Sequence, residues 1–249
     1  MAESLLTALI LFGATLISST FGFGSALFAM PLLTLLLGLS TATPLFGLVG
    51  PTISSIILIR NWQLVDLSSA WRLVLSTLVG IPLGVRLVTQ VPGESLTRLL
   101  GICLIGFGWY RLGRWRLLKL ESARWSGLFG FVAGILGGAY NTNGPPVVIY
   151  GEMRRWSPTE FRATLQSYFL PTGLGILASH ALSGFWNEQI FELYGVSLPG
   201  ILLAIAIGGW INHRLPTERF QSFLSVLLIG LGIMLWLLED DNMAVSFCW

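Results

Sequence analysis

Charged residues are scarce in this sequence. Asp, Glu, Lys and Arg make up 10% of the 249 residues, against about 25% in an ordinary soluble domain. Hydrophobic residues make up 54%, and the mean hydropathy is +0.76. This composition excludes a soluble single-domain enzyme. The 14 basic and 12 acidic residues give a net charge of only +2, so nothing supports nucleic-acid binding through a basic surface.

Residues that carry metal-ion or nucleophilic chemistry are also rare. The two cysteines, Cys103 and Cys248, frame neither a disulfide network nor a metal site. The two histidines, His180 and His213, lie at the ends of hydrophobic segments and are interpreted as interfacial, and no GxSxG-type nucleophile motif is present. None of the 12 acidic residues falls in the middle of a hydrophobic segment, where a cation channel or pump usually has carboxylates. We therefore expect no enzyme, metal or cofactor.

Long hydrophobic segments dominate the remaining sequence and predict an all-α polytopic membrane protein. Residues 1–6 contain Glu3 and no basic residue, and no small-residue cleavage site follows, so we expect the first segment to stay in the mature protein. Ten segments are predicted, at residues 5–22, 25–39, 43–59, 70–89, 96–110, 125–140, 145–153, 162–181, 193–212 and 220–238.

The two halves of the chain repeat each other on either side of a charged linker, residues 111–124. Residues 104–108 (LIGFG) match residues 228–232 (LIGLG) at an offset of 124. The glycines and prolines also fall in order. Their pairs are Pro92 with Pro216 at an offset of 124, and Gly24 with Gly144 and Pro51 with Pro171 at an offset of 120. Such residues are selected for backbone reasons, so we predict a duplication with repeats at 1–110 and 125–249.

The distribution of basic residues predicts the topology. With the N-terminus outside and five segments in each half, 12 of the 14 basic residues fall in inside loops, and only Arg86 and Arg98 fall outside. An odd number of segments per half inverts the second half, which predicts inverted-topology repeats. We therefore expect a multi-pass membrane protein with both termini outside.

Two segments are too short to cross a bilayer. At 1.5 Å per residue, residues 25–39 reach roughly 22 Å and residues 145–153 roughly 13 Å, against a hydrocarbon core of about 30 Å. Each could form a re-entrant hairpin with the segment before it or belong to a complete span, and the sequence leaves both open. The hairpin tips would be residues 20–25 (TFGFGS) and 140–146 (YNTNGPP). Such backbone survives at membrane depth only where protein or a water-filled cavity covers it.

The tips predict an anion site. Ser25 and Asn143 are expected N-caps, and Pro145 suits the first helical position, so two helix N-termini would converge with unpaired N–H groups and partial positive charge. The expected ligands combine hydroxyl or amide side chains with glycines that let backbone N–H groups approach; helix packing is the alternative role of the glycines. They are Gly22, Gly24, Ser25, Tyr140, Asn141, Thr142, Asn143 and Gly144.

Other polar residues form a second tier. Arg162 opens the eighth segment and is a candidate ligand for an anion arriving from inside, or a positive-inside anchor. Glu152 and Glu160 could carry a coupling proton or balance Arg154, Arg155 and Arg162. Candidate pore-lining residues flank the two matched prolines and the first tip, and plain proline kinks are the alternative. They are Thr20, Pro51, Thr52, Ser54, Ser55, Gln166, Ser167, Tyr168, Pro171 and Thr172.

The two tips carry a family resemblance. Residues 22–31 (GFGSALFAMP) and residues 143–164 (NGPPVVIYGEMRRWSPTEFRAT) resemble the glycine- and proline-rich motifs of the sulfite exporter TauE/SafE family. The resemblance covers essentially the whole chain and implies transport of sulfite, organosulfonates or related small anions across the bacterial inner membrane, often as export. We expect alternating access around an anion held between the tips. A membrane-embedded accessory protein without transport remains the alternative, and the coupling ion, proton or sodium, and a homo-oligomeric state stay open.

Overall fold

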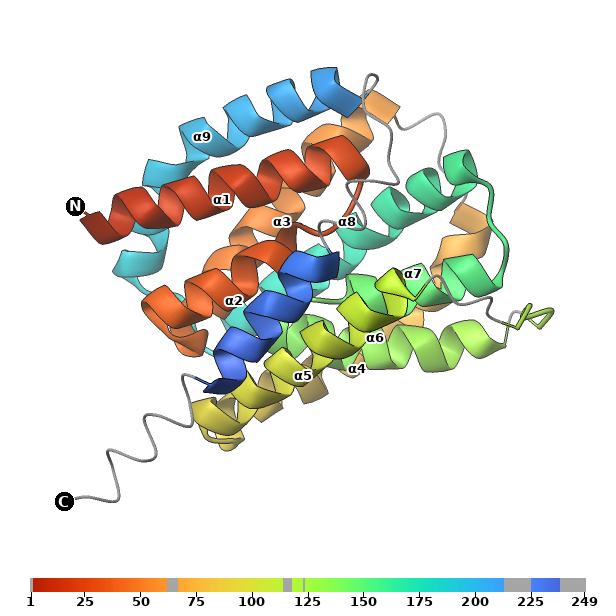
Figure 1. Cartoon of the computed structure of the whole chain (residues 1–249), viewed down its shortest axis with the longest axis horizontal. Coiled ribbons are helices and arrows are strands. Elements are labelled where there is room, and N and C mark those ends of the chain that lie inside the picture. The colour runs from red at the N-terminus through yellow and green to blue at the C-terminus, as the bar shows by residue number, and fades with distance from the viewer. Residues whose placement is uncertain (1, 62–66, 114–117, 123, 213–224, 238–249) are drawn as a thin grey trace.

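The structure is a computed structural model that describes residues 2–61, 67–113, 118–122, 124–212 and 225–237. Within these residues all regular structure is helical, and every predicted segment is a helix, which confirms the all-α fold. The helices are α1 (Ala2–Phe21), α2 (Ser25–Leu37), α3 (Leu39–Asn61), α4 (Leu67–Gln90), α5 (Gly93–Leu112), α6 (Trp125–Tyr140), α7 (Gly144–Met153), α8 (Pro158–Leu182), α9 (Glu188–Asn212) and the unlabelled C-terminal helix (Ser225–Leu237) (Figure 1).

Four helices are long and apolar enough to cross a membrane: α1, α3, α4 and α9. These helices, with the apolar shorter ones, make the chain a multi-pass membrane protein. By contrast, α2 has 13 residues and α7 has 10. Their lengths of roughly 20 Å and 15 Å fall short of the hydrocarbon core, as the sequence predicted for these two segments.

Both turns before the short helices use left-handed backbone. Between α1 and α2, Gly22 and Gly24 have φ angles of 88° and 100°, which glycine adopts without a steric penalty. Between α6 and α7 the same role falls to Asn141, with a φ of 54°, and asparagine tolerates this region better than most residues. The Asn141 N–H donates to the Gly137 carbonyl at 2.8 Å and so closes the last turn of α6. Each short helix therefore starts from a sharp reversal of the chain.

Glycines allow close packing of α4 against α6 and of α1 against α9, which lie side by side in Figure 1. A Cβ atom on Gly84 of α4 would lie 2.9 Å from the Ala139 backbone nitrogen, and one on Gly208 of α9 would lie 2.6 Å from the Ser19 Cβ. Small residues let membrane helices approach until their backbones touch. The two interfaces correspond, because Gly84 and Gly208 are 124 residues apart and Ser19 and Ala139 are 120 apart.

The C-terminal helix packs on α5 in the same reciprocal manner (Figure 1). A Cβ on Gly101 would lie 2.8 Å from the Gly232 carbonyl oxygen, and one on Gly108 would lie 2.8 Å from the Ser225 carbonyl oxygen. Adding 124 to Gly101 gives Ser225, and adding 124 to Gly108 gives Gly232. When each residue is replaced by its counterpart 124 positions away, the contact between Gly101 and Gly232 becomes the contact between Ser225 and Gly108. The interface is therefore symmetric in the way that a duplication of the two halves predicts.

The helices α3 and α8 pack against each other and contribute residues of both halves to the interior. A Cβ on Gly173 of α8 would lie 3.2 Å from the Pro51 ring of α3. Since α2 also packs on α3, this central pair is the surface against which the first tip is held.

Candidate functional site

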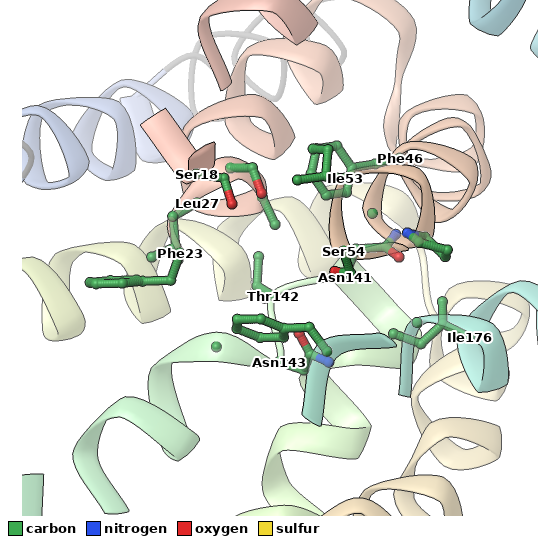
Figure 2. A pocket seen from close by; sticks show the side chains of 18 of the residues that line it. Ser18, Phe23, Leu27, Phe46, Ile53, Ser54, Asn141, Thr142, Asn143 and Ile176 are labelled. Atoms are coloured by element: carbon green, nitrogen blue, oxygen red, sulfur yellow. The ribbon is translucent and has the colours of Figure 1, made fainter. Parts of the chain in front are cut away.

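The turns between α1 and α2 and between α6 and α7, which are the two predicted tips, line one cavity together with α3 and α8. Its empty volume, including the space at its mouth, is about 640 Å³. Figure 2 shows Ser18, Phe23 and Leu27 on one side of this space and Asn141, Thr142 and Asn143 on another. The lining consists of Ser18, Phe23, Gly24, Ser25, Ala26, Leu27, Phe46, Gly50, Pro51, Ile53, Ser54, Asn141, Thr142, Asn143, Gly144, Pro145, Gln166, Phe169, Gly173 and Ile176.

Most of the predicted tip ligands lie in this cavity. The two sets come from tips about 120 residues apart in the sequence, and no local feature of the chain brings them together. They are Gly24, Ser25, Asn141, Thr142, Asn143 and Gly144, joined by the second-tier residues Pro51, Ser54 and Gln166.

The N-terminus of α2 lies in the cavity wall, and its first N–H groups have no hydrogen-bond partner among the described residues. The first helical bond runs from the Phe28 N–H to the Gly24 carbonyl at 3.1 Å. The N–H groups of Ser25, Ala26 and Leu27 precede this bond and have no acceptor within the helix. Our prediction that Ser25 is the N-cap is wrong, because Gly24 occupies that position and Ser25 is the first helical residue. The reason is the φ of 100° at position 24, which glycine accommodates.

The N-terminus of α7 offers fewer donors. Asn143 is the N-cap, as predicted, but its side chain makes no capping hydrogen bond. The helix begins at Gly144, so Pro145 is its second residue and not its first. Because Pro145 and Pro146 lack an N–H, the first turn supplies only the Gly144 N–H. The two helix N-termini therefore contribute unequally, and α2 has the stronger array.

Three amide side chains join the tips to the surrounding helices. The Asn141 Nδ2 donates to the Thr43 carbonyl at 2.7 Å, which fastens the second tip to α3. The Asn143 Nδ2 donates to the Thr172 Oγ1 at 3.1 Å, and the Gln166 Nε2 donates to the Gly22 carbonyl at 3.0 Å. The helix α8 thus holds one tip from each half, and these bonds orient the polar groups at the cavity wall.

The other predicted residues are not among the described residues that line the cavity. The Tyr140 hydroxyl donates to the Leu96 carbonyl at 3.0 Å, and the Thr52 hydroxyl lies 2.7 Å from that of Tyr194. Thr20 and Ser167 donate to carbonyls of their own helices, those of Leu16 and Thr164. Gly22 contributes its carbonyl to Gln166, whereas Ser55 and Pro171 lie elsewhere on α3 and α8. The side chains of Arg162 and Glu160 lie outside the described residues.

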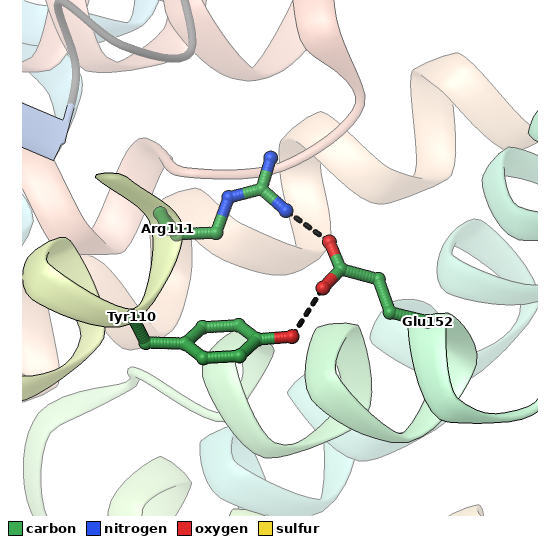
Figure 3. Close-up of polar contacts among 3 residues, drawn as sticks. All are labelled: Tyr110, Arg111 and Glu152. Atoms are coloured by element: carbon green, nitrogen blue, oxygen red, sulfur yellow. Dashed lines mark hydrogen bonds and ion pairs between the residues drawn. The ribbon is translucent and has the colours of Figure 1, made fainter. Parts of the chain in front are cut away.

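Every described residue that lines the cavity is uncharged. An ionic cluster of Tyr110, Arg111 and Glu152 lies next to Phe23, which is part of the cavity wall. The Arg111 guanidinium carbon is 5.8 Å from the centroid of the Phe23 ring. Figure 3 shows Arg111 and Tyr110 of α5 both bonded to the Glu152 carboxylate of α7. Our interpretation that Glu152 and Glu160 balance Arg154, Arg155 and Arg162 is corrected for Glu152, which pairs with Arg111 of the first half in the described part of the chain. Arg154 instead donates to the linker carbonyls of Leu120 and Glu121, at 3.0 and 2.7 Å.

The sequence reasoning missed one polar residue of the cavity wall, Ser18, although the run Ser18-Ser19-Thr20 at the end of a hydrophobic segment was a signal for it. Ser54, predicted as a second-tier pore residue beside Pro51, does line the cavity. The side chain of His180, which was interpreted as interfacial, is fully buried within the protein. Its Nε2 lies 3.3 Å from the Gly138 carbonyl, and the absent side chain of Gly47 leaves the space for the ring.

Comparison with known proteins gives one result. The model of the family described as Sulfite exporter TauE/SafE matches residues 6–235. No curated protein and no solved structure matches the chain. The matched region covers most of the 249 residues and includes both tips, so the chain belongs to the sulfite exporter TauE/SafE family of membrane transporters.

Proposed function

We propose that this protein carries sulfite or an organosulfonate across the bacterial inner membrane and holds the anion between the tips of its two hairpins. Membership of the sulfite exporter TauE/SafE family supports a membrane permease for small anions and favours export as the direction. The observation that carries the proposed site is the shared cavity, in which both tips and the first turn of α2 meet. Free N–H groups and the positive end of the helix dipole favour an anion there.

The chemistry of the lining suits transport better than tight storage. A buried lysine or arginine would hold an anion strongly, whereas conduction requires a site that the substrate can leave. Hydroxyl groups of Ser18, Ser25 and Ser54 and the amides of the second tip can solvate an oxyanion without fixed charge. An uncharged site of this kind can bind the anion without preventing its release.

The mechanism proposed is alternating access between two inverted repeats, residues 1–110 and 125–249. The reciprocal packing of α5 with the C-terminal helix at an offset of 124 supports the duplication. The matching pairs α1 with α9 and α6 with α4 support it further. Transporters of this class move their substrates by rocking one repeat against the other around a fixed site.

The orientation proposed places both termini outside and the ionic cluster inside. Arg111 and Glu152 lie at the ends of α5 and α7, where the linker also docks through a 3.0 Å bond from the Leu120 N–H to the Met153 carbonyl. The basic residues of this linker belong to the inside face by the positive-inside rule. The anion would then enter from the face that carries Arg111. A proton or sodium ion as the coupling ion and a homo-oligomer remain compatible with this scheme.

The test is sulfite flux in proteoliposomes. We expect Asn143→Ala to lower flux about 10- to 100-fold, because it removes an amide from the wall and its bond to Thr172, a loss of about 1.4–3 kcal/mol. Asn141→Ala should act similarly. Ser25→Ala should lower sulfite flux only a few-fold, since the backbone N–H of residue 25 remains.

The matched control is Ser197→Ala, which removes a buried hydroxyl that bonds within α9 and does not line the cavity. Its flux should stay within about twofold of wild type, because substitutions away from the site usually act weakly on it. Unchanged flux in all three tip variants would contradict the site. Absence of sulfite flux in the wild-type protein would instead favour an accessory role.

A further inference from the structure

Gln166 presents a hydrogen-bond acceptor that the protein does not use. This residue lies on α8, lines the cavity and is 7% exposed. Its Nε2 donates to the Gly22 carbonyl at 3.0 Å. Its Oε1 is buried and has no hydrogen-bond partner within the described part of the chain.

The orientation of this amide is determined by its neighbour. The Gly22 carbonyl can only accept, so the amide nitrogen must face it and the Oε1 must point elsewhere. A buried acceptor without a partner costs about 1–3 kcal/mol. Such groups are rare in native structures and call for an explanation. Because solvent does not reach this oxygen, the Gln166 side chain must turn toward the cavity before a substrate that brings its own donor can satisfy the Oε1.

The charge of the lining gives a second, independent constraint on the substrate. No residue that lines the described cavity carries a charge, so nothing in the wall neutralises a bound anion fully. The electrostatic cost of removing an ion from water grows with the square of its charge, and it is large even for one charge. The cavity therefore discriminates against a dianion and favours a single negative charge.

On the basis of the proposed function, we infer that Gln166 selects singly charged oxyanions that carry a hydrogen-bond donor. Hydrogen sulfite has this chemistry, whereas sulfite has two charges and no donor. A hydroxyalkyl sulfonate also has it, whereas an alkyl sulfonate does not. In the complex, the substrate O–H donates to the Gln166 Oε1, and its other oxygens accept from the N–H groups of Ser25, Ala26 and Leu27.

The experiment compares two sulfonates by calorimetric titration of the purified protein in lipid nanodiscs. Propane-1-sulfonate and 2-hydroxyethanesulfonate have equal charge and equal numbers of non-hydrogen atoms, and they differ in the hydroxyl donor. We expect the wild-type protein to bind the hydroxyl compound about tenfold or more tightly, as sites with a dedicated polar partner do. In Gln166→Met, which keeps the side-chain length and removes the amide, the ratio should fall to about one. Ser197→Ala should keep the wild-type ratio.

The wild-type protein supplies a second measurement that does not depend on the folding of a variant. The affinity for total sulfite should fall as the pH rises through the second ionisation of sulfurous acid, while the affinity for methanesulfonate, a permanent monoanion, stays constant. Equal binding of the two sulfonates, or sulfite affinity that stays constant or rises with pH, would overturn the role of Gln166 and leave the anion site standing. Failure to bind any of these anions would overturn the proposed function itself.

Discussion

Ser25→Asp is expected to abolish anion binding in a protein that still folds. Ser25 is the first residue of α2, and its N–H group belongs to the unpaired array in the cavity wall. A carboxylate in the first turn of a helix stabilises it by about 0.3–1 kcal/mol. The same carboxylate occupies the positive end of the helix and repels a second anion. Two charges about 4 Å apart repel by about 4 kcal/mol at an effective dielectric constant near 20, so we expect at least a hundredfold loss of sulfite affinity.

The matched control is Ser25→Asn, which has nearly the same shape as the Asp variant and no charge. Its sulfite affinity should stay within a few-fold of wild type, because the backbone N–H groups are unchanged. Sulfite binding and thermal unfolding are measured for both variants in the same detergent. If the Asp variant binds sulfite as tightly as the Asn variant, the N-terminus of α2 is not the anion site.

Gly134→Leu is expected to prevent stable packing of α4 on α6. A Cβ at Gly134 would collide with the Thr77 carbonyl oxygen and lie 2.8 Å from the Gly80 Cα, so the clash involves backbone that cannot rotate away. Overpacking of this kind costs about 1–3 kcal/mol and more where backbones must separate. A loss of about 3 kcal/mol lowers the midpoint of thermal unfolding by roughly 6–12 °C in a protein of this size.

Gly127→Leu is the control on the same helix, since a Cβ at Gly127 meets no atom within 4 Å. Its unfolding midpoint and its elution profile in detergent should match those of the wild-type protein. Because α6 carries the second tip at its C-terminal end, the Gly134 variant should also lose sulfite flux. A Gly134 variant as stable as the Gly127 variant would contradict the close contact between α4 and α6.

The sequence predicted the helices and the tips because their signals are local. Hydrophobic length located each helix, and Gly24 and Gly144, at matching positions in the two halves, located the turns. The strained backbone of a reversal leaves a direct mark in residue type, as Gly22 and Gly24 show with their positive φ angles. The identity of six cavity residues followed from these tips alone.

The remaining contacts depend on neighbours far along the chain, which one sequence does not reveal. Glu152 pairs with Arg111, 41 residues away, although Arg154 is much closer in sequence. His180 is buried because Gly47 of another helix leaves room for its ring. The two prolines that follow Gly144 signalled a helix start, but they also remove the N–H donors that the predicted anion site needed.

The central claim is that a small oxyanion binds between the two hairpin tips. Selenite has the shape of sulfite and contains an anomalous scatterer, so a crystal soaked with selenite locates the anion directly. The account predicts an anomalous peak in the cavity, within about 3.5 Å of donors from the first turn of α2 and near Asn143. An ordered selenite bound elsewhere in the protein, with no peak between Ser25 and Asn143, would contradict it.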